Sequence, residues 1–319
     1  MIIYSHASPH DAHNIQKFIS ENWKENHILS KNNKVFDHFY LQHKTLQFFI
    51  AKNNNEIVGI LGYMTSKQFD SSIYLNAIWL ALWATKKSLR EPVGINLIKY
   101  LEDYFQHADL IACLGVATPV IPIYERMGYK SGQMEHLKKE ISDSNNSSND
   151  EYKISSAQLR DIDKNSIIYK TTESIRNKYL SQNFYDYDIF SLTLNNLPIT
   201  SIIGRVLHDN TSDINIFRII DFCGDIDGLS LLANKLSNSN FIKNINFIDI
   251  LISESEIFIG SDFTSCTQDN FLPLYFEPLV EEYKIKNYVY KILSKSFKED
   301  LIIISGDGDQ ERPNSIKNH

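Results

Sequence analysis

The sequence has few cysteines and no cluster of basic residues. Its three cysteines, Cys113, Cys223 and Cys266, lie far apart and form no CxxC pair. This pattern excludes the common zinc and dithiol motifs and predicts reduced structural thiols and no metal site. A formal charge of -7 without a run of Lys or Arg argues against a large nucleic-acid surface, which needs many cations on one face. We therefore expect no nucleic-acid partner.

A long apolar run and an export signal are also lacking. The longest apolar run, around residues 78–84, is far shorter than the roughly 20 residues of a membrane helix. The first residues have no basic start, and no small-residue cleavage site is evident. We therefore expect a cytoplasmic protein without a membrane partner, and the sequence leaves the oligomeric state open.

The chain has enough hydrophobic material for two domains. Its 319 residues are 43% hydrophobic, which allows two separate cores. Residues 142–150 are all Ser, Asn or Asp, a composition typical of an exposed linker or hairpin tip. We place the boundary there, which predicts a first domain at residues 1–141, a linker at 142–152, a second domain at 153–305 and a polar tail at 306–319.

The first half begins with a helix signal followed by three strand signals. Ser8 and Pro9 open a helix with a hydroxyl cap and a proline in the first turn. Residues 46–52 and 56–64 flank a run of asparagines and should pair as an antiparallel hairpin. Residues 73–83 are apolar at nearly every position, which predicts a central strand covered on both faces.

The next elements alternate helix and strand. Helical spacing of apolar residues predicts a helix over residues 94–105, a buried strand follows at 110–115, and a short helix at 122–127 ends at Gly128. After a hairpin at residues 190–206, the second half presents strand, helix and strand in the same order, which indicates an internal repeat. The repeated elements are residues 214–223, 229–236 and 245–252.

One loop has the features of an anion site. Around residues 83–98 a central strand ends, a loop turns and a helix begins, so free backbone N–H groups and the positive helix end point to one place. Arg90 adds a cation, Lys86 and Lys87 add to the positive field, and Gly94 allows close approach. The pattern predicts a pyrophosphate site, although a helix-start glycine also occurs without a ligand.

Two motifs resemble the GNAT acetyltransferase superfamily. The run Arg90-Glu91-Pro92-Val93-Gly94-Ile95-Asn96 resembles its cofactor loop, Gln/Arg-x-x-Gly-x-Gly/Ala, but the Arg is one place early and Asn96 replaces the second small residue. The second hallmark is an apolar strand followed by a short helix with Tyr and then Gly-Phe or Gly-Tyr. It is better kept, in residues 111–115 and in Tyr124-Glu125-Arg126-Met127-Gly128-Tyr129.

The resemblance implies a fold, a co-substrate and a site. The expected fold is α/β (α+β), with two GNAT-like domains that each contain a mixed, mostly antiparallel sheet flanked by helices. The expected co-substrate is acetyl-CoA or another acyl-CoA. The implied cofactor-binding residues are Leu82, Trp83, Ala84, Arg90, Pro92, Val93, Gly94, Ile95 and Asn96.

Tyr124 is the implied catalytic residue. By the resemblance it protonates the leaving CoA thiolate, while backbone groups of residues 82–84 hold the pantetheine and polarise the thioester carbonyl. A phenol near a developing thiolate is a suitable general acid, and strand N–H groups stabilise an oxyanion. A lone helix tyrosine is more often a packing residue, and Trp79 and Trp83 also suit ordinary core positions.

Candidate acceptor residues lie after the first predicted helix. His27, Asp37, His38 and His43 precede the hairpin, where GNAT-like enzymes shape the acceptor pocket. Any of them is a possible base, although each alone is more often a solvated or packing residue. The sequence does not select the general base.

The tail offers further acceptor candidates. Asp307, Asp309 and Arg312 can hydrogen-bond sugar hydroxyls, an amine or a phosphate, and the two aspartates also suit a hard cation. A polar terminus is usually exposed, but a buried-looking strand at residues 301–304 would position this one. In the second half, residues 224–228 place two carboxylates where the first half has its anion loop, so we expect one CoA site, in the first domain.

The layout and tail also resemble two-domain acyltransferases encoded with bacterial surface-glycan genes. That resemblance implies acyl transfer to an amino sugar, free or nucleotide-linked, by direct attack in a ternary complex. One alternative is an aminoacyltransferase that uses charged tRNA, which the charge of -7 disfavours. Another is a non-catalytic module that no longer binds CoA. The acyl chain and the choice between N- and O-transfer stay open.

Overall fold

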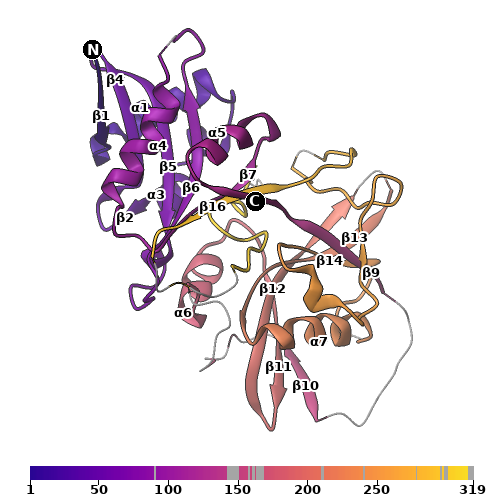
Figure 1. Ribbon diagram of the computed structural model, residues 1–319. Coiled ribbons are helices and arrows are strands. Elements are labelled where there is room, and N and C mark those ends of the chain that lie inside the picture. Colours follow the sequence, from indigo (N-terminus) through magenta and orange to yellow (C-terminus); the bar gives the residue numbers. More distant parts are fainter. Residues whose placement is uncertain are drawn as a thin grey trace.

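The computed structural model contains two sheets of seven strands each, with helices on their faces (Figure 1). This confirms the predicted α/β class with mixed, mostly antiparallel sheets. None of the helices in the described part of the chain has the length and apolar character that a membrane crossing requires. The structure describes residues 1–89, 91–141, 151–156, 159, 162, 169–209, 212–239, 241–277, 279–294, 297 and 301–314.

The first sheet has the strand order β1-β4-β5-β6-β7-β16-β8. Its neighbours are antiparallel except β6 and β7, which are parallel and connected through helix α4 (Val93–Tyr104). A separate two-stranded hairpin, β2 (Leu41–Gln42) with β3 (Thr45–Leu46), precedes β4. The strands of the sheet are β1 (Ile2–His6), β4 (Phe48–Asn53), β5 (Glu56–Thr65), β6 (Ala77–Thr85), β7 (Leu110–Val116), β16 (Asn287–Ile292) and β8 (Lys130–Gln133).

Local sequence explains the hairpin and the first helix. Asn54 and Asn55 have φ angles of 49° and 66°, the left-handed conformation that a tight two-residue turn needs, so the predicted hairpin of β4 and β5 is confirmed. Ser8 and Asp11 form a capping box before α1 (Ala12–Asn22), as expected from a hydroxyl at the helix start. The central strand begins later than residue 73, because β6 starts at Ala77.

Helices cover both faces of the first sheet. On one face, α4 and α5 (Ile121–Arg126) contribute Leu97, Ile98 and Tyr124 to a core with Leu61 of β5. The other face packs against α1, α2 (Ile28–Lys31) and α3 (Asn33–Tyr40), whose buried residues continue into the core of the second sheet. The predicted stop of α5 is confirmed, because Gly128 has a φ of 87°.

The second sheet has the order β10-β11-β12-β13-β14-β9-β15. Its only parallel pair within the described residues is β13 with β14, connected through helix α7 (Ile226–Ser237). This repeats the arrangement of β6, α4 and β7 and confirms the predicted internal repeat. The remaining helix, α6 (Thr172–Ile175), continues into a π-helical turn, Arg176–Leu180. The strands are β10 (Tyr152–Ser156), β11 (Asp188–Leu194), β12 (Leu197–Asp209), β13 (Ile214–Gly224), β14 (Phe247–Ile252), β9 (Glu135–Glu140) and β15 (Thr264–Ser265).

Each sheet contains a strand from the other half of the chain. β9 lies between β14 and β15 in the second sheet, and β16 lies between β7 and β8 in the first (Figure 1). The sheets therefore do not divide at one point in the sequence, as contiguous domains at residues 1–141 and 153–305 would. Residues 142–150 of the predicted linker lie outside the described residues.

Most of the described residues after 300 are buried or half-buried between the two halves. Residues 301–303 belong to no regular element and Ile304 makes an isolated bridge to Ile252, so the predicted strand at 301–304 is wrong. Asp307 and Asp309 are 2% and 1% exposed, which excludes an exposed polar terminus at these positions. This tail segment, residues 301–314, contacts both sheets, through Ser305 and Gly306 at β13 and β14 and through Gln310 at Gly115 of β7.

Candidate active site

Strands β6 and β7 diverge where their parallel pairing ends, at Leu80 and Cys113. Just beyond that point β6 contains a bulge, because Ala81 and Leu82 together lie opposite the single residue Gly62 of β5. A bulge bends its strand and increases the local twist. The result is an opening in the middle of the first sheet.

A cavity of about 340 Å³ lies in this opening. It brings together the predicted catalytic residue Tyr124, the predicted cofactor residues Leu82 and Trp83, and the predicted acceptor residues Asp309 and Arg312. Its walls come from β6, β7 with the loop after it, α5 and the tail segment. The lining residues are Trp23, Ala81, Leu82, Trp83, Cys113, Leu114, Gly115, Val116, Ala117, Val120, Tyr124, Tyr275, Asp309, Gln310 and Arg312.

Helix α4 begins beside the cavity without a side-chain cap. Its N-cap residue is Pro92, which has no side-chain oxygen to accept the first helical N–H groups. Val93 N–H donates to the Glu91 carbonyl oxygen (2.8 Å), but Gly94 and Ile95 N–H have no acceptor among the described residues. Two unpaired donors at the positive end of a 12-residue helix favour an anion.

Trp83 connects this helix end to the cavity. Its indole lies so close to Gly94 that a Cβ at that position would be 2.7 to 2.9 Å from the ring atoms. On the other side its ring meets Tyr124, with centroids 5.8 Å apart. Trp83 Nε1 is buried and has no acceptor among the described residues. Because a buried N–H without a partner costs about 1–3 kcal/mol, a polar ligand group that accepts from it would be stabilised here.

Tyr124 lies at the cavity wall, and its hydroxyl donates a hydrogen bond to the Cys113 sulfur. The residue is 2% exposed, and this burial raises the pKa of its hydroxyl well above the ordinary value. The phenol is therefore protonated throughout the neutral range. Burial also raises the pKa of the Cys113 thiol to about 12, which makes this cysteine a poor nucleophile.

A carboxylate from the tail forms another part of the wall. Asp309 accepts from the Tyr40 hydroxyl (2.5 Å) and pairs with the Arg312 guanidinium. The same Tyr40 hydroxyl oxygen accepts a hydrogen bond from the backbone N–H of Leu82 at the β6 bulge. Burial raises the pKa of Tyr40, so its hydroxyl stays a donor to Asp309. The tail is thereby tied to the strand that forms the cavity.

The matching opening of the second sheet is filled by the chain itself. Parallel pairing of β13 and β14 ends at Ile219 and Ile250, and the tail segment enters beyond that point. Gly306 N–H donates to the Ile220 carbonyl oxygen of β13 (2.9 Å), and Ser305 N–H donates to the Leu251 carbonyl oxygen of β14 (3.1 Å). The tail backbone therefore bridges the two diverging strands and occupies the space between them.

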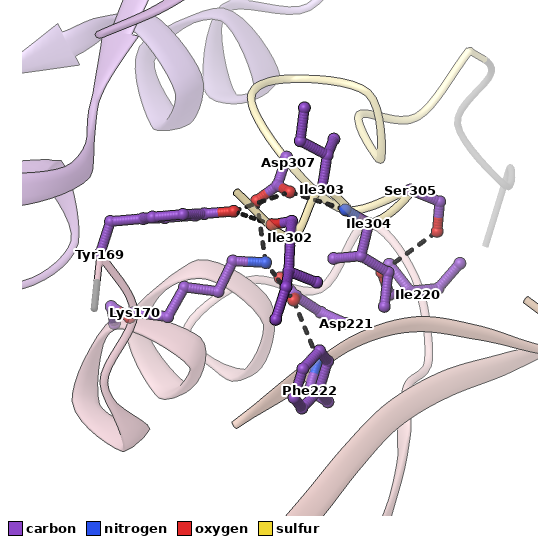
Figure 2. A network of polar contacts seen from close by, with 12 residues as sticks. Tyr169, Lys170, Ile220, Asp221, Phe222, Ile302, Ile303, Ile304, Ser305 and Asp307 are labelled. Carbon is purple, nitrogen blue, oxygen red and sulfur yellow. Dashed lines mark hydrogen bonds and ion pairs between the residues drawn. The ribbon is translucent and has the colours of Figure 1, made fainter. Parts of the chain in front are cut away.

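Buried charges hold the tail in this second opening (Figure 2). The Asp307 carboxylate accepts from Ile304 N–H (2.8 Å) and pairs with Lys170 Nζ (2.8 Å), which also pairs with Asp221 (2.6 Å). Tyr179 donates to the other oxygen of Asp221 (2.7 Å). All three charged groups are enclosed, so the network fixes the position from which residues 309–312 extend to the first cavity.

The start of α7 also contrasts with the start of α4. Asp225 is the N-cap of α7, and its carboxylate accepts from Asp227 N–H (3.1 Å). The positive end of this helix is thus already compensated by a protein anion. Of the two carboxylates that the sequence places in this loop, that of Asp225 acts as the helix cap.

The other cofactor candidates contribute in different ways. The Val93 side chain points into the core and packs against Gly59, where an added Cβ would lie 2.8 Å from Val93 Cγ1. Asn96 Nδ2 donates to the Tyr4 hydroxyl (3.1 Å). Ala84 is partly buried and packs against the core that α1, α2 and α3 share with the second sheet. Arg90 lies outside the described residues.

The acceptor candidates of the first half are not gathered at the cavity. Asp37 is exposed, and His38 Nε2 contacts the Lys178 carbonyl oxygen (3.0 Å). His27 is buried behind Trp23, with ring centroids 4.7 Å apart, and burial lowers its pKa to about 4. In the tail, Asp307 lines a separate cavity of about 50 Å³ with Lys170 and Asp221.

The sequence did not single out the wall residues Trp23, Tyr275 and Gln310, nor Tyr40, which donates to the wall residue Asp309. Tyr40 and its partner Asp309 are 269 residues apart, and neither belongs to a local motif. The side chain of Gln310 lies against Gly115, whose φ of 81° favours glycine. Only the folded chain brings these groups together.

Several solved structures resemble this chain. No family model matches it, and no curated protein sequence matches it. A GCN5-related N-acetyltransferase from Anabaena variabilis ATCC 29413 is similar in structure, with a TM-score of 0.62 and 13% identity over 92% of this chain and 73% of that chain. A GCN5-related N-acetyltransferase from Kribbella flavida gives a TM-score of 0.56 and 9% identity over 92% and 72%. The two-sheet architecture is therefore that of GNAT-like duplicated domains, and at these identities the similarity establishes the fold alone.

Proposed function

We propose that the protein is an acyl-CoA-dependent acyltransferase with its co-substrate in the opening between β6 and β7. The pyrophosphate would accept from Gly94 and Ile95 N–H, and the pantetheine would pass Trp83 towards Tyr124. The contrast between the halves carries this proposal. The described residues leave the first opening and helix start accessible, whereas residues 305–306 and Asp225 occupy their counterparts.

The reaction would be a direct attack in a ternary complex. The acceptor nitrogen attacks the thioester carbonyl carbon and forms the C–N bond, while the carbonyl oxygen becomes an oxyanion. When this intermediate collapses, the C–S bond breaks, the nitrogen loses a proton and the CoA sulfur gains one. Of the backbone N–H groups at residues 82–84, that of Leu82 already donates to the Tyr40 hydroxyl, so those of Trp83 and Ala84 are the donors proposed for the oxyanion.

Tyr124 is proposed to donate the proton to the CoA sulfur. Its raised pKa keeps the hydroxyl protonated, but it also makes transfer to an ordinary thiolate, with a pKa of about 8.5, unfavourable. The surroundings correct this mismatch, because an apolar site raises the basicity of any thiolate in it. Cys113 reports that effect, since burial at the same wall raises the pKa of its thiol to about 12.

The acceptor is proposed to be an amino sugar, free or nucleotide-linked, with acetyl-CoA as donor and a role in surface-polysaccharide synthesis in the cytoplasm. The wall formed by Asp309, Gln310 and Arg312 supplies polar groups, and Trp23 and Tyr275 supply aromatic faces. A few polar groups on a largely apolar wall suit a small polar molecule with several hydroxyls. The structural neighbours are described as N-acetyltransferases, and we propose the same activity for this chain.

Acetyl-CoA binding and consumption test this proposal. Saturation at 100 times Kd should stabilise the folded protein by about 2.7 kcal/mol in thermal unfolding, and a panel of amino sugars should then show CoA release. Tyr124→Phe should lower kcat by roughly 100-fold or more with CoA binding retained. Tyr129→Phe is the matched control, because its ring packs 5.1 Å from that of Tyr124 but outside the cavity wall. A protein that acetyl-CoA does not stabilise would favour the non-catalytic alternative.

A further inference from the structure

A groove on the α1 side of the first sheet adjoins the cavity at Tyr124. Its inner part has a volume of about 830 Å³ and its outer part about 340 Å³, and both parts are lined by Glu21, Asn22 and Lys86. The inner part also shares Trp23 with the cavity. We call this space the α1 groove. It is lined by Asn14, Lys17, Phe18, Ser20, Glu21, Asn22, Trp23, Glu25, Asn54, Asn55, Glu56, Ile57, Lys86, Lys87 and Ser88.

Trp23 lies at the junction between the cavity and the α1 groove. It is the C-cap residue of α1, so the end of that helix determines its position. Its ring centroid lies 4.7 Å from that of His27, and the Arg312 guanidinium lies 6.0 Å from it. Trp23 is nevertheless 44% exposed. The fold therefore holds an indole at this junction and leaves part of its apolar surface open to a ligand.

The cavity alone is small for two reactants. Its volume of about 340 Å³ is close to the lower end of ligand sites, which span about 300 to 1,000 Å³. The same space must hold the thioester end of the cofactor and the acceptor amine. Any acceptor larger than one small unit must therefore extend beyond the cavity, and the α1 groove is the adjoining space.

The α1 groove and the start of α4 lie on opposite faces of the first sheet. Phe18 and Ile57 of the groove belong to the core that α1 helps to form, whereas Val93 and Leu97 of α4 belong to the core on the other face. An acceptor in the groove and a cofactor at α4 would thus approach the opening from different sides. This arrangement suits direct attack in a ternary complex.

The charges along the α1 groove cancel. Three lysines and three glutamates are found among its described lining residues. Lys17 pairs with Glu21 (3.8 Å), and Lys86 pairs with Glu56. A ligand with several phosphates requires an excess of cations, which this surface does not offer. The balance of charge therefore favours a neutral ligand.

The uncharged polar groups of the groove are amides and hydroxyls. They belong to Asn14, Asn22, Asn54, Asn55, Ser20 and Ser88. An amide presents donors and an acceptor together, as neighbouring sugar hydroxyls do, so the two match. An extended peptide fits less well, because β4 and β5 are paired on both sides and offer no free strand edge.

We propose that the acceptor amino sugar is the terminal unit of a neutral oligosaccharide and that the α1 groove binds the sugars that follow it. This inference rests on the proposed acyltransferase function and narrows its acceptor class to an oligosaccharide instead of a nucleotide-linked monosaccharide. The terminal amine enters the cavity, the next sugar packs on Trp23, and later sugars form hydrogen bonds with the asparagine amides.

Sugars of different length test this proposal without turnover. The full-length protein is saturated with CoA and titrated calorimetrically with glucosamine and with tetrasaccharides in which glucosamine is followed by three neutral sugars, in an α-linked and a β-linked series. The tetrasaccharide of one series should bind about tenfold or more tightly than glucosamine, the scale of one or two additional hydrogen bonds. Trp23→Ala should remove most of this gain.

A block in the groove provides a matched comparison. Glu21→Cys removes one member of an exposed ion pair, and the native thiols are buried, so a bulky maleimide should label position 21 alone. Lys34→Cys, at an exposed position outside the lining of the groove and the cavity, is the control. The label at position 21 should weaken tetrasaccharide binding by about tenfold or more and leave glucosamine binding unchanged. The label at position 34 should change neither.

The outcomes separate the two proposals. Equal affinity for glucosamine and both tetrasaccharides, or no measurable affinity for any of them, overturns the oligosaccharide groove even if acyl transfer is observed. Unchanged tetrasaccharide affinity after labelling of Glu21→Cys overturns it as well. Absence of CoA binding overturns the acyltransferase function, whereas the same titrations without CoA then decide on the groove separately.

Discussion

Gly94→Ala perturbs the proposed pyrophosphate site by a single methyl group. The new Cβ would lie 2.7 Å from Trp83 Cζ2 and 2.9 Å from Nε1, whereas comfortable contacts need about 3.5 Å or more. The indole must therefore move by close to an ångström. Overpacking of this kind costs about 1–3 kcal/mol, and the better helix propensity of alanine returns about 1 kcal/mol, so the net loss of stability should be about 0–2 kcal/mol.

The same movement should weaken acyl-CoA binding. It displaces the unpaired indole N–H from the start of α4, and losing one such donor should reduce affinity by roughly tenfold. Gly228→Ala in α7 is the matched control, because its Cβ would lie 2.2 Å from Thr200 Oγ1 but far from the proposed site. It should lower stability in urea unfolding and leave calorimetric affinity for acetyl-CoA unchanged.

A double variant separates crowding from the loss of the donor. Gly94→Ala with Trp83→Phe removes the bulk that causes the clash, so stability should recover, but it also removes the N–H, so affinity should not. Acetyl-CoA affinity of Gly94→Ala equal to that of wild type, in a protein that remains folded, would refute the assignment of this helix start to the cofactor.

Two further predictions concern stability. Burial lowers the pKa of His27 to about 4 in the folded protein, whereas the unfolded chain protonates near pH 6.5. The stability that neutral His27 contributes is therefore fully present above pH 6.5, and the free energy of unfolding is lower by about 2 kcal/mol at pH 5. His27→Asn, which can still cap Leu29 N–H, should flatten that fall in urea unfolding, and identical pH profiles would contradict the burial argument. Lys170→Met should cost ~3–5 kcal/mol because it leaves Asp221 and Asp307 uncompensated, and adding Asp307→Asn should recover part of the loss; a single variant as stable as wild type would contradict the tail network.

Local chemistry made much of the first half predictable. Two asparagines with positive φ, at positions 54 and 55, set the hairpin of β4 and β5, and Gly128 sets the end of α5. The continuous apolar run marked β6, and the strand-helix-strand order revealed the repeat in the second half. Each of these features is determined by residues that are neighbours in the sequence, so it can be predicted from one sequence alone.

The exchanged strands were not predictable in the same way. Lys138 and Lys139 give β9 a polar composition, yet both are only 6% exposed because Asn270 and Asp262 satisfy them from the second half. Alternation of residues indicates a strand but not its partner. The choice of β14 for β9, and of β7 for β16, depends on contacts between residues far apart in the chain.

The site shows the same division. Tyr124 and Trp83 were found through motifs, but the tail residues reach the cavity only because the network around Asp307 fixes residues 305–306 in the second opening. A pattern in the sequence suggests which groups do chemistry, and the fold decides which of them meet.

A crystal structure with acetyl-CoA bound tests the central claim most directly. The account predicts the pyrophosphate oxygens within hydrogen-bond distance of Gly94 and Ile95 N–H and the thioester sulfur beside the Tyr124 hydroxyl, with residues 305–306 still seated between β13 and β14. Density for the cofactor at α7, or a displaced tail with the pantetheine in the second opening, would contradict it.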